Sequence, residues 1–455
     1  MTNTPPMIYV PQPQLPITYI QLCFSIHHSD LLSLSNSDSA PQSSALRILT
    51  QRQLQRGTQR IDRANFIRQI ENLGTELQLT HRGYAHSVGA ITLTRTLPQL
   101  SDLLQQAIIE PAFNSDEIEQ SKRAYISELE ARYDDDQSLA WLWLSRRLHL
   151  NHVLWGDYSI EAKHIEAIKV EEMQQAWPKL FNRTRFLPSF TSDLAKDKLS
   201  AMIEPLYDDL SWGEVKSTSS SSLFQPCTLA SLDPLSKTNL TLVHKGGKQQ
   251  ALIFIAHPTI ALDHPQALAL FVALCALGGT FSAPLMHEIR TKRGLSYGAH
   301  AGIKGEGHCR FVCVYCTPEA PQVSEALMVM LQVYQRGGRG ELSDNEIQFA
   351  KDYLINAHPF SMETPAMRAG MLANSSLMGI DPNLFFTQAE RIKKLSPQEI
   401  RQSAQEHLSA QKLEILVYGD QEQIGDTLLN ELQSSIAVDQ VIRVKAKDGP
   451  EHIRV

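Results

Sequence analysis

GGTFSAPLMHEIRTKRGLSY, residues 278–297, follows an apolar run of eleven residues and begins with two adjacent glycines. Apolar residues recur at helical spacing over residues 282–292, which predicts a short amphipathic helix there. Gly294 is suited to end this helix in the left-handed conformation, and the chain from Leu295 onward is typical of a strand. The stretch therefore predicts a helix, a glycine stop and a strand in direct succession.

Arg290 and Tyr297 lie seven residues apart across this predicted switch from helix to strand. An arginine presents a charged fork of hydrogen-bond donors, and a tyrosine adds one neutral donor. Such a pair suits the carbonyl oxygen of a peptide, or the negative charge that develops on that oxygen during attack. Spacing alone leaves a structural alternative open, because an arginine in the last helical turn complements the helix dipole and a tyrosine packs well in a strand.

The composition is that of a soluble globular protein with more than one domain. The 455 residues exceed an ordinary single core, and 42% of them are apolar while 20% are charged. A formal net charge of −7 disfavours a nucleic-acid partner. The longest apolar run is shorter than the roughly 20 residues that span a bilayer, so no membrane span is expected. Six cysteines do not form a disulfide scaffold in a chain of this length.

The amino-terminal sequence, MTNTPPMIYVPQPQLP, has no basic segment before an apolar core, so it is not expected to be a signal peptide. The localisation is therefore unknown from the sequence. Cytoplasmic is the default expectation, and a periplasmic location requires that a signal has been removed.

The order of predicted elements in the first half of the chain recurs in the second half. Each half begins with a strand and a helix, continues with a hairpin and further helices, and closes with a strand. We therefore expect an α+β fold with two tandem homologous domains, residues 1–203 and 241–455. Each domain is expected to be an antiparallel-rich sheet packed with helices, and a Ser-rich linker, residues 204–240, is expected to join them.

The repeat consists of short strands and amphipathic helices. The expected strands are residues 18–25, 76–79, 85–93, 185–190, 251–256, 297–303, 309–316 and 413–418. The expected helices are residues 44–56, 63–72, 97–109, about 115–132, 137–150, 170–181, 265–277 and 323–334, with two more beginning near residues 343 and 397.

The two repeats, the Gly-Gly break and the motif EIRTKRGLSYG together resemble the insulinase/pitrilysin family of zinc peptidases over roughly residues 8–435. The resemblance is greatest to the branch with separate subunits, which includes mitochondrial processing peptidase and bacterial heterodimeric relatives. In such families an Arg/Tyr pair in the second half of one subunit completes a zinc site in the first half of another. Arg290 and Tyr297 match that pair, and the resemblance implies catalytic and substrate-binding roles for them. It also implies substrate binding by Gly278 and Gly279. Thr280 follows these glycines directly, so the longer glycine-rich loop of the mitochondrial α subunit is missing, which favours a bacterial-type pair.

The zinc motif of this family is absent from the sequence. An inverted H-x-x-E-H motif places two histidines four residues apart on a helix, with a glutamate as general base. None of the 16 histidines fits that pattern, and the corresponding positions hold Ile48, Gln51 and Arg52. Glu128 matches the family's third ligand, but a single carboxylate does not hold catalytic zinc. It is therefore expected to be a solvated or ion-paired helix residue.

The resemblance thus implies a non-catalytic subunit of a heterodimeric zinc metallopeptidase, inactive alone. This chain is expected to bind no metal or cofactor, and the zinc is expected in a partner subunit that carries H-x-x-E-H and cleaves peptides. The alternative is a structural subunit without a peptidase role, similar to the core subunits of respiratory complexes. A third interpretation is a stand-alone metalloenzyme with unusual ligands.

Three cysteines, Cys309, Cys313 and Cys316, have the spacing of a loop that holds an iron–sulfur cluster. Their surroundings, CRFVCVYC, are typical of a strand, which places Cys309 and Cys313 on one face and Cys316 on the other. Buried thiols are therefore the better interpretation.

Histidines and charged runs are weaker candidates for a site. His149 and His152 could bind a metal with Glu161, but an unpatterned surface pair is favoured. The His27-His28 pair follows a strand, and His287 is expected to be a partly exposed surface residue. Residues 134–136, three aspartates, are expected to form a solvated turn. Trp141 and Trp143 are expected in the core or an interface, and residues 336–340, RGGRG, in a loop too short to cradle phosphate.

Overall fold

A computed structural model describes residues 6–26, 34, 39–211, 224–408, 411–425 and 427–453. The His27-His28 pair and the serine run at the centre of the expected linker lie outside these described residues.

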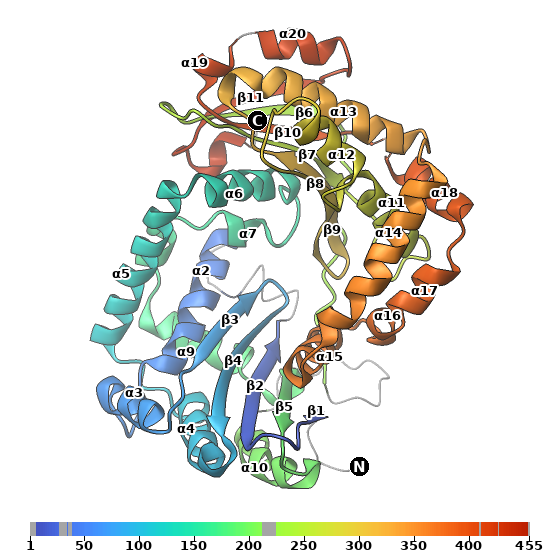
Figure 1. Cartoon of the computed structure of the whole chain (residues 1–455). Helices are drawn as coiled ribbons and strands as arrows, with labels where there is room; N and C mark the ends of the chain where they lie inside the picture. Colours follow the sequence, from blue (N-terminus) through green and yellow to red (C-terminus); the bar gives the residue numbers. More distant parts are fainter. Residues whose placement is uncertain are drawn as a thin grey trace. The chain divides into compact units, whose positions relative to one another are not determined.

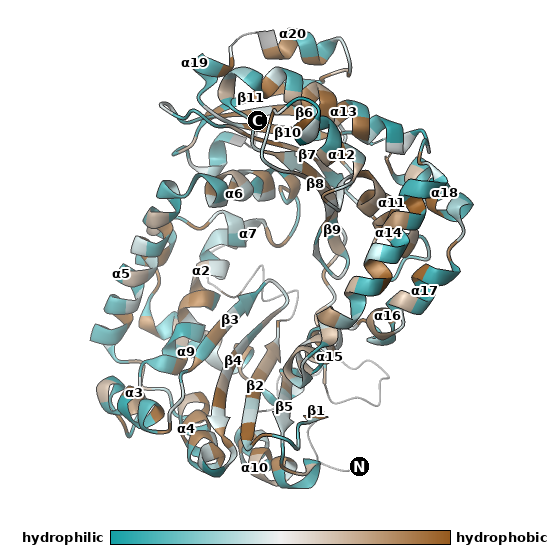
Figure 2. Cartoon of the chain, in the orientation of Figure 1, coloured by the Kyte–Doolittle hydropathy of each residue, from teal (hydrophilic) through white to brown (hydrophobic). Residues whose placement is uncertain are grey.

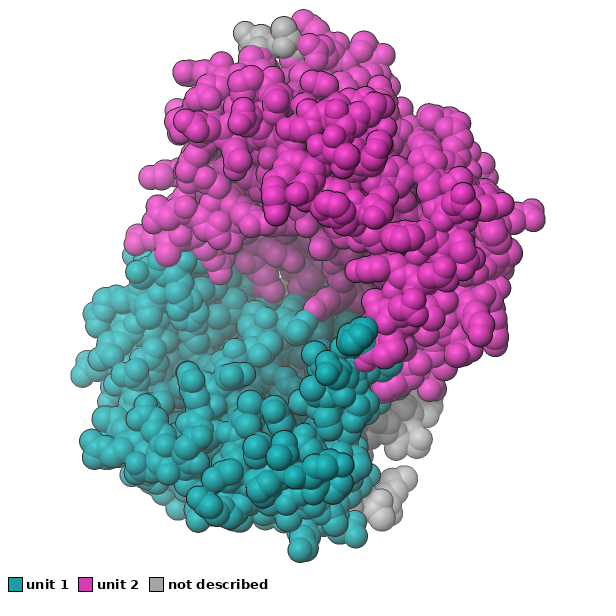
Figure 3. Space-filling model, viewed as in Figure 1, with its two compact units in different colours: residues 1–129, 159–229, 360–382 teal, residues 130–158, 230–359, 383–455 magenta. Residues whose placement is uncertain are grey.

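The chain forms two compact units, which Figure 3 draws in different colours. Unit 1 comprises residues 1–129, 159–229 and 360–382, and unit 2 comprises residues 130–158, 230–359 and 383–455. This division differs from the two contiguous domains expected from the sequence, residues 1–203 and 241–455. The difference arises because each unit includes one segment from the other half of the chain.

Unit 1 is built around a five-stranded sheet with the strand order β1-β5-β2-β4-β3 (Figure 1). Strand β1 runs parallel to β5, and the other neighbouring strands are antiparallel. The strands are β1 (Ile8–Pro11), β2 (Ile17–Ser25), β3 (Gln78–Arg82), β4 (Ala85–Leu93) and β5 (Phe186–Ser192). Every residue of β5 is buried, as expected for an inner strand that is covered on both faces.

Unit 2 contains a six-stranded sheet with the strand order β11-β6-β10-β7-β9-β8. Strand β6 runs parallel to both β10 and β11, and the remaining neighbours are antiparallel. The strands are β6 (Asn239–His244), β7 (Leu252–Pro258), β8 (Ala299–Glu306), β9 (Cys309–Cys316), β10 (Glu414–Gly419) and β11 (Gln440–Lys445).

The two sheets have the same topology once β11 is set aside. The order β6-β10-β7-β9-β8 repeats the order β1-β5-β2-β4-β3, with the single parallel pair at the same place. The expected α+β class, with two similar sheets packed with helices, is therefore confirmed.

Helices pack against both sheets. The α-helices of unit 1 are α2 (Ala40–Gln51), α3 (Arg63–Asn72), α4 (Leu97–Ile109), α5 (Ser115–Ala131), α8 (Ala162–Glu166), α9 (Val170–Leu180), α10 (Lys196–Asp209) and α15 (Pro365–Met378). Those of unit 2 are α6 (Asp136–Leu148), α7 (Trp155–Tyr158), α11 (Ala267–Gly278), α12 (Pro284–Met286), α13 (Val323–Gly338), α14 (Asp344–Ala357), α16 (Asn383–Phe386), α17 (Gln388–Lys394), α18 (Pro397–Leu408), α19 (Gln421–Ile424) and α20 (Thr427–Gln433).

Helices α6 and α15 are the exchanged segments. Helix α15 comes from the second half of the chain and packs against β1, β2 and β5 of unit 1. Helix α6 comes from the first half and packs against β7 and β10 of unit 2. Trp143 of α6 is fully buried and donates to the Ala446 carbonyl oxygen at 3.3 Å, while the Trp141 ring contacts the Phe254 ring at 4.8 Å. The expectation that both tryptophans are core or interface residues is confirmed.

Local capping fixes the starts of several helices where the sequence predicts them. At α14, Ser343 and Glu346 form a reciprocal capping box, with the Ser343 amide donating to the Glu346 carboxylate at 2.8 Å. Figure 2 shows hydrophilic and hydrophobic bands on this helix, and its buried residues include Ile347 and Ala350. Helix α15 ends at Gly379 in the left-handed conformation, with φ of 69°.

Several element boundaries differ from those expected. Helix α2 begins at Ala40 rather than residue 44, because Ser39 caps it and a proline occupies its first turn. Helix α10, which ends at Asp209 within the expected linker, was not expected, and neither were strands β1, β6 and β11. Strand β8 begins at Ala299 rather than at Tyr297.

A buried ion pair between α6 and β10 leads to a prediction about stability. Arg147 is 4% exposed and donates to Glu414, which is 0% exposed, at 3.1 Å. Asn239 and Thr241 also donate to the Glu414 carboxylate. Arg147→Ala would leave a buried carboxylate without its cation, and we expect it to lower the free energy of unfolding by about 3–5 kcal/mol. Urea denaturation measures this change.

The exposed Arg132, in the turn directly after α5, supplies the control for that measurement. Arg132→Ala is expected to change stability by less than about 0.5 kcal/mol. Equal effects of the two substitutions would show that the buried pair does not hold α6 on the sheet of unit 2.

Candidate functional site

The stretch 278–297 forms two helical turns and a glycine stop in unit 2. After α12, a single π-helical turn covers His287–Thr291, and the Lys292 amide donates to the His287 carbonyl oxygen at 2.9 Å. Gly294 follows with φ of 66°, so the expected left-handed stop is confirmed. Leu285 and Ile289 are fully buried and anchor the turn to the core. π-Helical turns are frequent at functional sites.

Arg290 lies between two exposed aromatic rings. Its guanidinium carbon is 4.4 Å from the centre of the Tyr297 ring and 4.8 Å from the centre of the Phe281 ring. Tyr297 is 84% exposed and Phe281 is 63% exposed. Tyr297 precedes β8 instead of packing within it, so the interpretation of Tyr297 as an ordinary strand residue is wrong.

The neighbouring cations differ from Arg290 in having a carboxylate partner. Glu288 is 3.2 Å from the Lys292 ammonium and accepts a hydrogen bond from Arg293. The bond from Arg293 lowers the pKa of the Glu288 carboxyl group. Within the described ranges, neither the Arg290 guanidinium nor the Tyr297 hydroxyl has a hydrogen-bond or ion-pair partner. Their donors are therefore available to a ligand.

His287, on the same turn, is exposed and lies 3.8 Å from Glu288, as expected for a surface histidine.

The two glycines that begin the stretch have a packing function in the structure. A Cβ atom on Gly278 would lie 2.8 Å from the Ala301 side chain and 2.8 Å from the Leu285 side chain. A Cβ atom on Gly279 would lie 2.7 Å from the Cα atom of Cys275. Glycine thus lets the end of α11 approach β8 and α12 closely. The implied role of Gly278 and Gly279 in substrate binding stays a prediction.

The positions of the absent zinc motif lie in unit 1, where an ion pair joins Arg52 to Glu128. Arg52 donates to both carboxylate oxygens of Glu128, at 2.9 Å and 2.5 Å, and its guanidinium stacks 4.3 Å above the Tyr125 ring. The expectation that Glu128 is an ion-paired helix residue is thus supported by geometry. A guanidinium in contact with the carboxylate would repel a divalent cation.

Gln51 and Ile48 complete this arrangement. The Gln51 side-chain amide donates to the carbonyl oxygens of Thr80, at 2.9 Å, and Ser87, at 3.1 Å, and so joins α2 to the β3–β4 hairpin. Ile48 packs against the hydrophobic core of unit 1. One position holds an apolar side chain, one an amide and one a cation, so these residues do not fit the family's zinc ion.

His149 and Cys309 are brought together in unit 2, which the sequence did not predict. The Cys309 thiol lies 3.5 Å from Nε2 of His149, and both residues are buried. The interpretation of His149 as a surface residue is therefore wrong. Burial lowers the pKa of His149 to about 4 and raises the pKa of Cys309 to about 12. His152 joins them, whereas Glu161 pairs with Lys163 and is not part of this group.

The other cysteines of the CRFVCVYC strand are buried thiols, as expected. Cys316 contacts the sulfur of Met330 at 3.3 Å, and Cys313 is fully buried. In the part of the chain that the structure describes, no metal-ligand group joins the three cysteines.

The aspartate run at residues 134–136 is more structured than a solvated turn. Asp135 caps α6, and Asp136 lies 2.6 Å from the Lys245 and Lys248 ammonium groups. Burial raises the pKa of Asp136, but hydrogen bonds from Lys245, Lys248 and Tyr418 outweigh this and lower it. This aspartate is a structural ion-pair partner.

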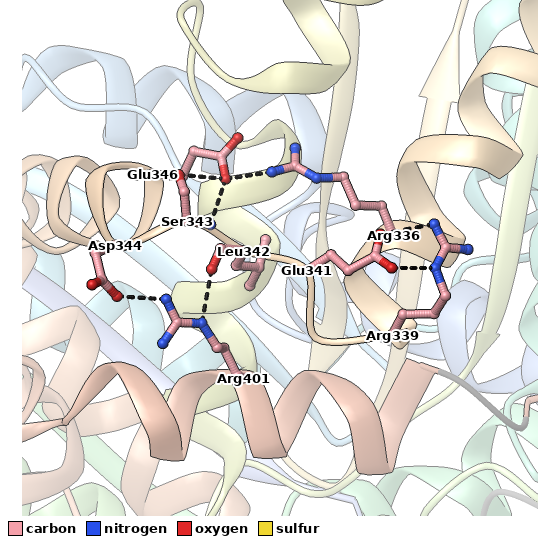
Figure 4. Close-up of polar contacts among 8 residues, drawn as sticks. All are labelled: Arg336, Arg339, Glu341, Leu342, Ser343, Asp344, Glu346 and Arg401. Carbon is pink, nitrogen blue, oxygen red and sulfur yellow. Dashed lines mark hydrogen bonds and ion pairs between the residues drawn. The ribbon is translucent and has the colours of Figure 1, made fainter.

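The RGGRG stretch is also occupied by internal contacts, which Figure 4 shows. Residues 336–338 end α13 instead of forming the expected loop. Arg336 lies 2.6 Å from Glu346, and Arg339 lies 2.8 Å from Glu341 (Figure 4). Both arginines are paired with carboxylates, which gives no support to phosphate binding.

Comparisons with known proteins agree with this fold. Residues 167–354 match the family model of the peptidase M16 inactive domain. The non-peptidase homolog YmxG of Helicobacter pylori is 21% identical over 407 residues, which are 88% of this chain and 89% of that protein. The uncharacterized zinc protease MT2852 of Mycobacterium tuberculosis is 24% identical over 308 residues, which are 65% of this chain and 64% of that protein. The crystal structure of a peptidase M16 inactive domain from Pseudomonas fluorescens has a TM-score of 0.79 at 18% identity, covering 92% of this chain and 97% of that one.

These matches show that residues 167–354 are similar to the peptidase M16 inactive domain, and that the fold of the chain is similar to that of a solved M16 inactive domain. The resemblance inferred from the sequence is confirmed. In the described residues, no helix is both long enough and apolar enough to cross a membrane.

Gly278→Ala tests the close approach of α11 to β8. The added methyl group would meet side-chain and backbone atoms of Ala301 at 3.0 Å or less, so the substitution should destabilise the chain by about 1–3 kcal/mol. Gly298 is the matched control, because a Cβ atom there has nothing within 4 Å. Thermal unfolding of both variants measures the difference, and equal midpoints would contradict the packing role.

A triple substitution tests the assignment of the lost zinc positions. Ile48→His, Gln51→Glu and Arg52→His together restore H-x-x-E-H and free Glu128 from its ion pair with Arg52. We expect one more zinc ion per chain than in the parent protein, measured by elemental analysis after dialysis. Adding Glu128→Ala should abolish the gain. No additional zinc in the triple variant would show that these positions are not the family's site.

Proposed function

We propose that this chain is the non-catalytic subunit of a heterodimeric zinc metallopeptidase, with the zinc held by a partner subunit that carries H-x-x-E-H. In this proposal the chain supplies Arg290 and Tyr297 to the site that the partner completes. The observation that carries it is the exposed Arg290–Tyr297 stack, in which the described structure gives neither donor group a hydrogen-bond partner. The partner's zinc supplies Lewis-acid chemistry when the complex is assembled.

The ion pair between Arg52 and Glu128 supports the assignment of zinc to another polypeptide. It occupies the two positions of unit 1 where the family has a histidine and a glutamate ligand. The name of one relative, non-peptidase homolog, also fits a chain without its own metal site.

The chemistry of Arg290 and Tyr297 follows from the donors they present. The Arg290 fork would donate to the carbonyl oxygen of the peptide, and the Tyr297 hydroxyl would add a neutral donor. Stacking between two rings restricts the guanidinium, so less conformational entropy is lost when a peptide binds. Donors held in this way act most strongly on the negative charge that develops during attack.

A structural subunit without a peptidase role is the second candidate. The description of YmxG as a non-peptidase homolog fits this function as well. The exposure of Tyr297 and Phe281 beside Arg290 favours the first proposal, since a scaffold has no need of unpaired donors near its surface.

The double variant Arg290→Ala, Tyr297→Phe tests the first proposal. Mixed with the zinc-bearing partner, it is expected to lose at least 10²-fold to 10³-fold in peptide cleavage, because removing one such donor commonly has that effect. A pool of quenched fluorescent peptides reports the rate, and co-purification reports assembly, which is expected to persist.

Lys292→Ala is the matched control, because Lys292 lies on the same surface but is paired with Glu288. It should retain the activity of the unmodified complex. Full activity of the double variant would refute the role of Arg290 and Tyr297. A partner that cleaves peptides equally well without this chain would favour the structural subunit.

A further inference from the structure

Three side chains of metal-ligand type gather in unit 2, although they are distant in the sequence. His149 follows α6, His152 lies in the next turn, and Cys309 begins β9. One ligand atom from each of them lies within 4.8 Å of the other two. We name them the His149–His152–Cys309 cluster.

His149 is already oriented as a ligand. Its Nδ1 lies 2.8 Å from the Ser145 carbonyl oxygen, which can only accept a hydrogen bond. Nδ1 therefore carries the hydrogen, and Nε2 presents a lone pair toward the Cys309 sulfur at 3.5 Å. A backbone carbonyl that fixes the second ring nitrogen is the usual support of a metal-binding histidine.

The spacing of His149 and Cys309 fits a tetrahedral zinc ion. Zinc–sulfur bonds of about 2.3 Å and zinc–nitrogen bonds of about 2.0–2.1 Å place two tetrahedral ligand atoms roughly 3.3–3.6 Å apart. The separation of 3.5 Å between Cys309 and His149 matches this value. One ring nitrogen of His152 lies within 4.8 Å of both of these ligand atoms, so His152 has to move closer to complete the site.

Both ring nitrogens of His152 have hydrogen-bond partners. It is partly buried in a turn, and its Nδ1 accepts from the Leu154 amide at 3.2 Å. Its Nε2 lies 3.0 Å from the Ala230 carbonyl oxygen, so Nε2 carries the hydrogen. If Nδ1 of His152 bound a metal instead of accepting from the Leu154 amide, the bond from Nε2 to the Ala230 carbonyl oxygen would still orient the ring. A backbone carbonyl oxygen orients His149 in the same way.

Two acidic residues act electrostatically on the cluster. Glu306 lies opposite Cys309 in the β8–β9 ladder, and its negative charge acts on the Cys309 thiol. Asp157 acts electrostatically on His149 in the same way. Two imidazoles and a thiolate match the ligand preference of zinc, and a carboxylate or water can supply a fourth ligand.

We propose that the His149–His152–Cys309 cluster is a structural zinc site of this chain. On binding, the Cys309 S–H bond breaks, its proton leaves to solvent, and the sulfur forms a bond to zinc without any change of oxidation state. The ion joins the end of α6 to β9 and so fixes the segment that unit 2 takes from the first half of the chain. This revises the expectation that the chain binds no metal. It is independent of the proposed peptidase role.

Metal binding by the full-length chain tests this site. After treatment with a chelator and dialysis, the chain is expected to take up one Zn²⁺, and Zn²⁺ is expected to raise Tm by roughly 5 °C. Co²⁺ as a spectroscopic probe should give a thiolate-to-cobalt charge-transfer band. Cys309→Ala should remove that band, and His152→Gln should weaken binding at least tenfold. His152 is partly exposed, so this second variant is expected to fold normally.

Cys316→Ala is the matched control, because Cys316 lies on the same strand and contacts Met330 instead of the cluster. It should keep the zinc and the cobalt band. Absence of bound zinc in the unmodified chain would leave only a hydrogen bond between Cys309 and His149 and overturn the proposal. Retention of zinc in both cluster variants, or preference for Cu⁺ over Zn²⁺, would overturn the assignment as well.

Discussion

The ion pair between Arg52 and Glu128 is the constraint from which the role of this chain follows. Arginine stays charged at any physiological pH, and here it forms two hydrogen bonds with a carboxylate that the family uses as a zinc ligand. A divalent cation would have to displace the guanidinium and would gain no ligand from Ile48 or Gln51. Gln51 is committed elsewhere, since it joins α2 to the carbonyl oxygens of two strands. Any contribution of this chain to peptide cleavage therefore has to come from hydrogen-bond donors, and not from a metal ion at these positions.

Arg290 is suited to that contribution because its surroundings differ from those of its neighbours. Lys292 and Arg293 are both held by Glu288, so a ligand would have to break an ion pair to reach them. Arg290 is held instead by two aromatic rings, an interaction worth about 0.5–1 kcal/mol at an exposed site. Within the described residues no carboxylate pairs with this guanidinium, so its N–H groups remain available to a ligand. Gly294, in the left-handed conformation, ends the helical turn between Arg290 and Tyr297.

The local features of the fold were predictable from the sequence, and the contacts between distant segments were not. Helices α3 and α4 have the expected bounds, since their apolar periodicity lies within the segments themselves. The same holds for the capping box of α14 and the stop at Gly294. The Arg/Tyr pair was found because both residues lie in one short motif. Periodicity shows that α6 is amphipathic but does not show which sheet it covers. His149 and Cys309 are separated by 160 residues, and no local pattern links them.

Because the two sheets have the same topology, something in α6 has to determine which sheet it packs against. Both sheets have an equivalent strand order, so apolar packing alone gives a helix little reason to prefer one over the other. Buried polar contacts remove this ambiguity, because a misplaced partner would leave a charge without compensation. Arg147 finds the carboxylate of Glu414 on β10, whereas the equivalent strand β5, with the sequence FLPSFTS, has no acidic residue. Two residues further along, His149 meets Cys309 on β9. We therefore expect Arg147 of α6 and the adjoining His149 to direct the helix to the sheet of unit 2, while apolar residues such as Trp143 supply the packing energy.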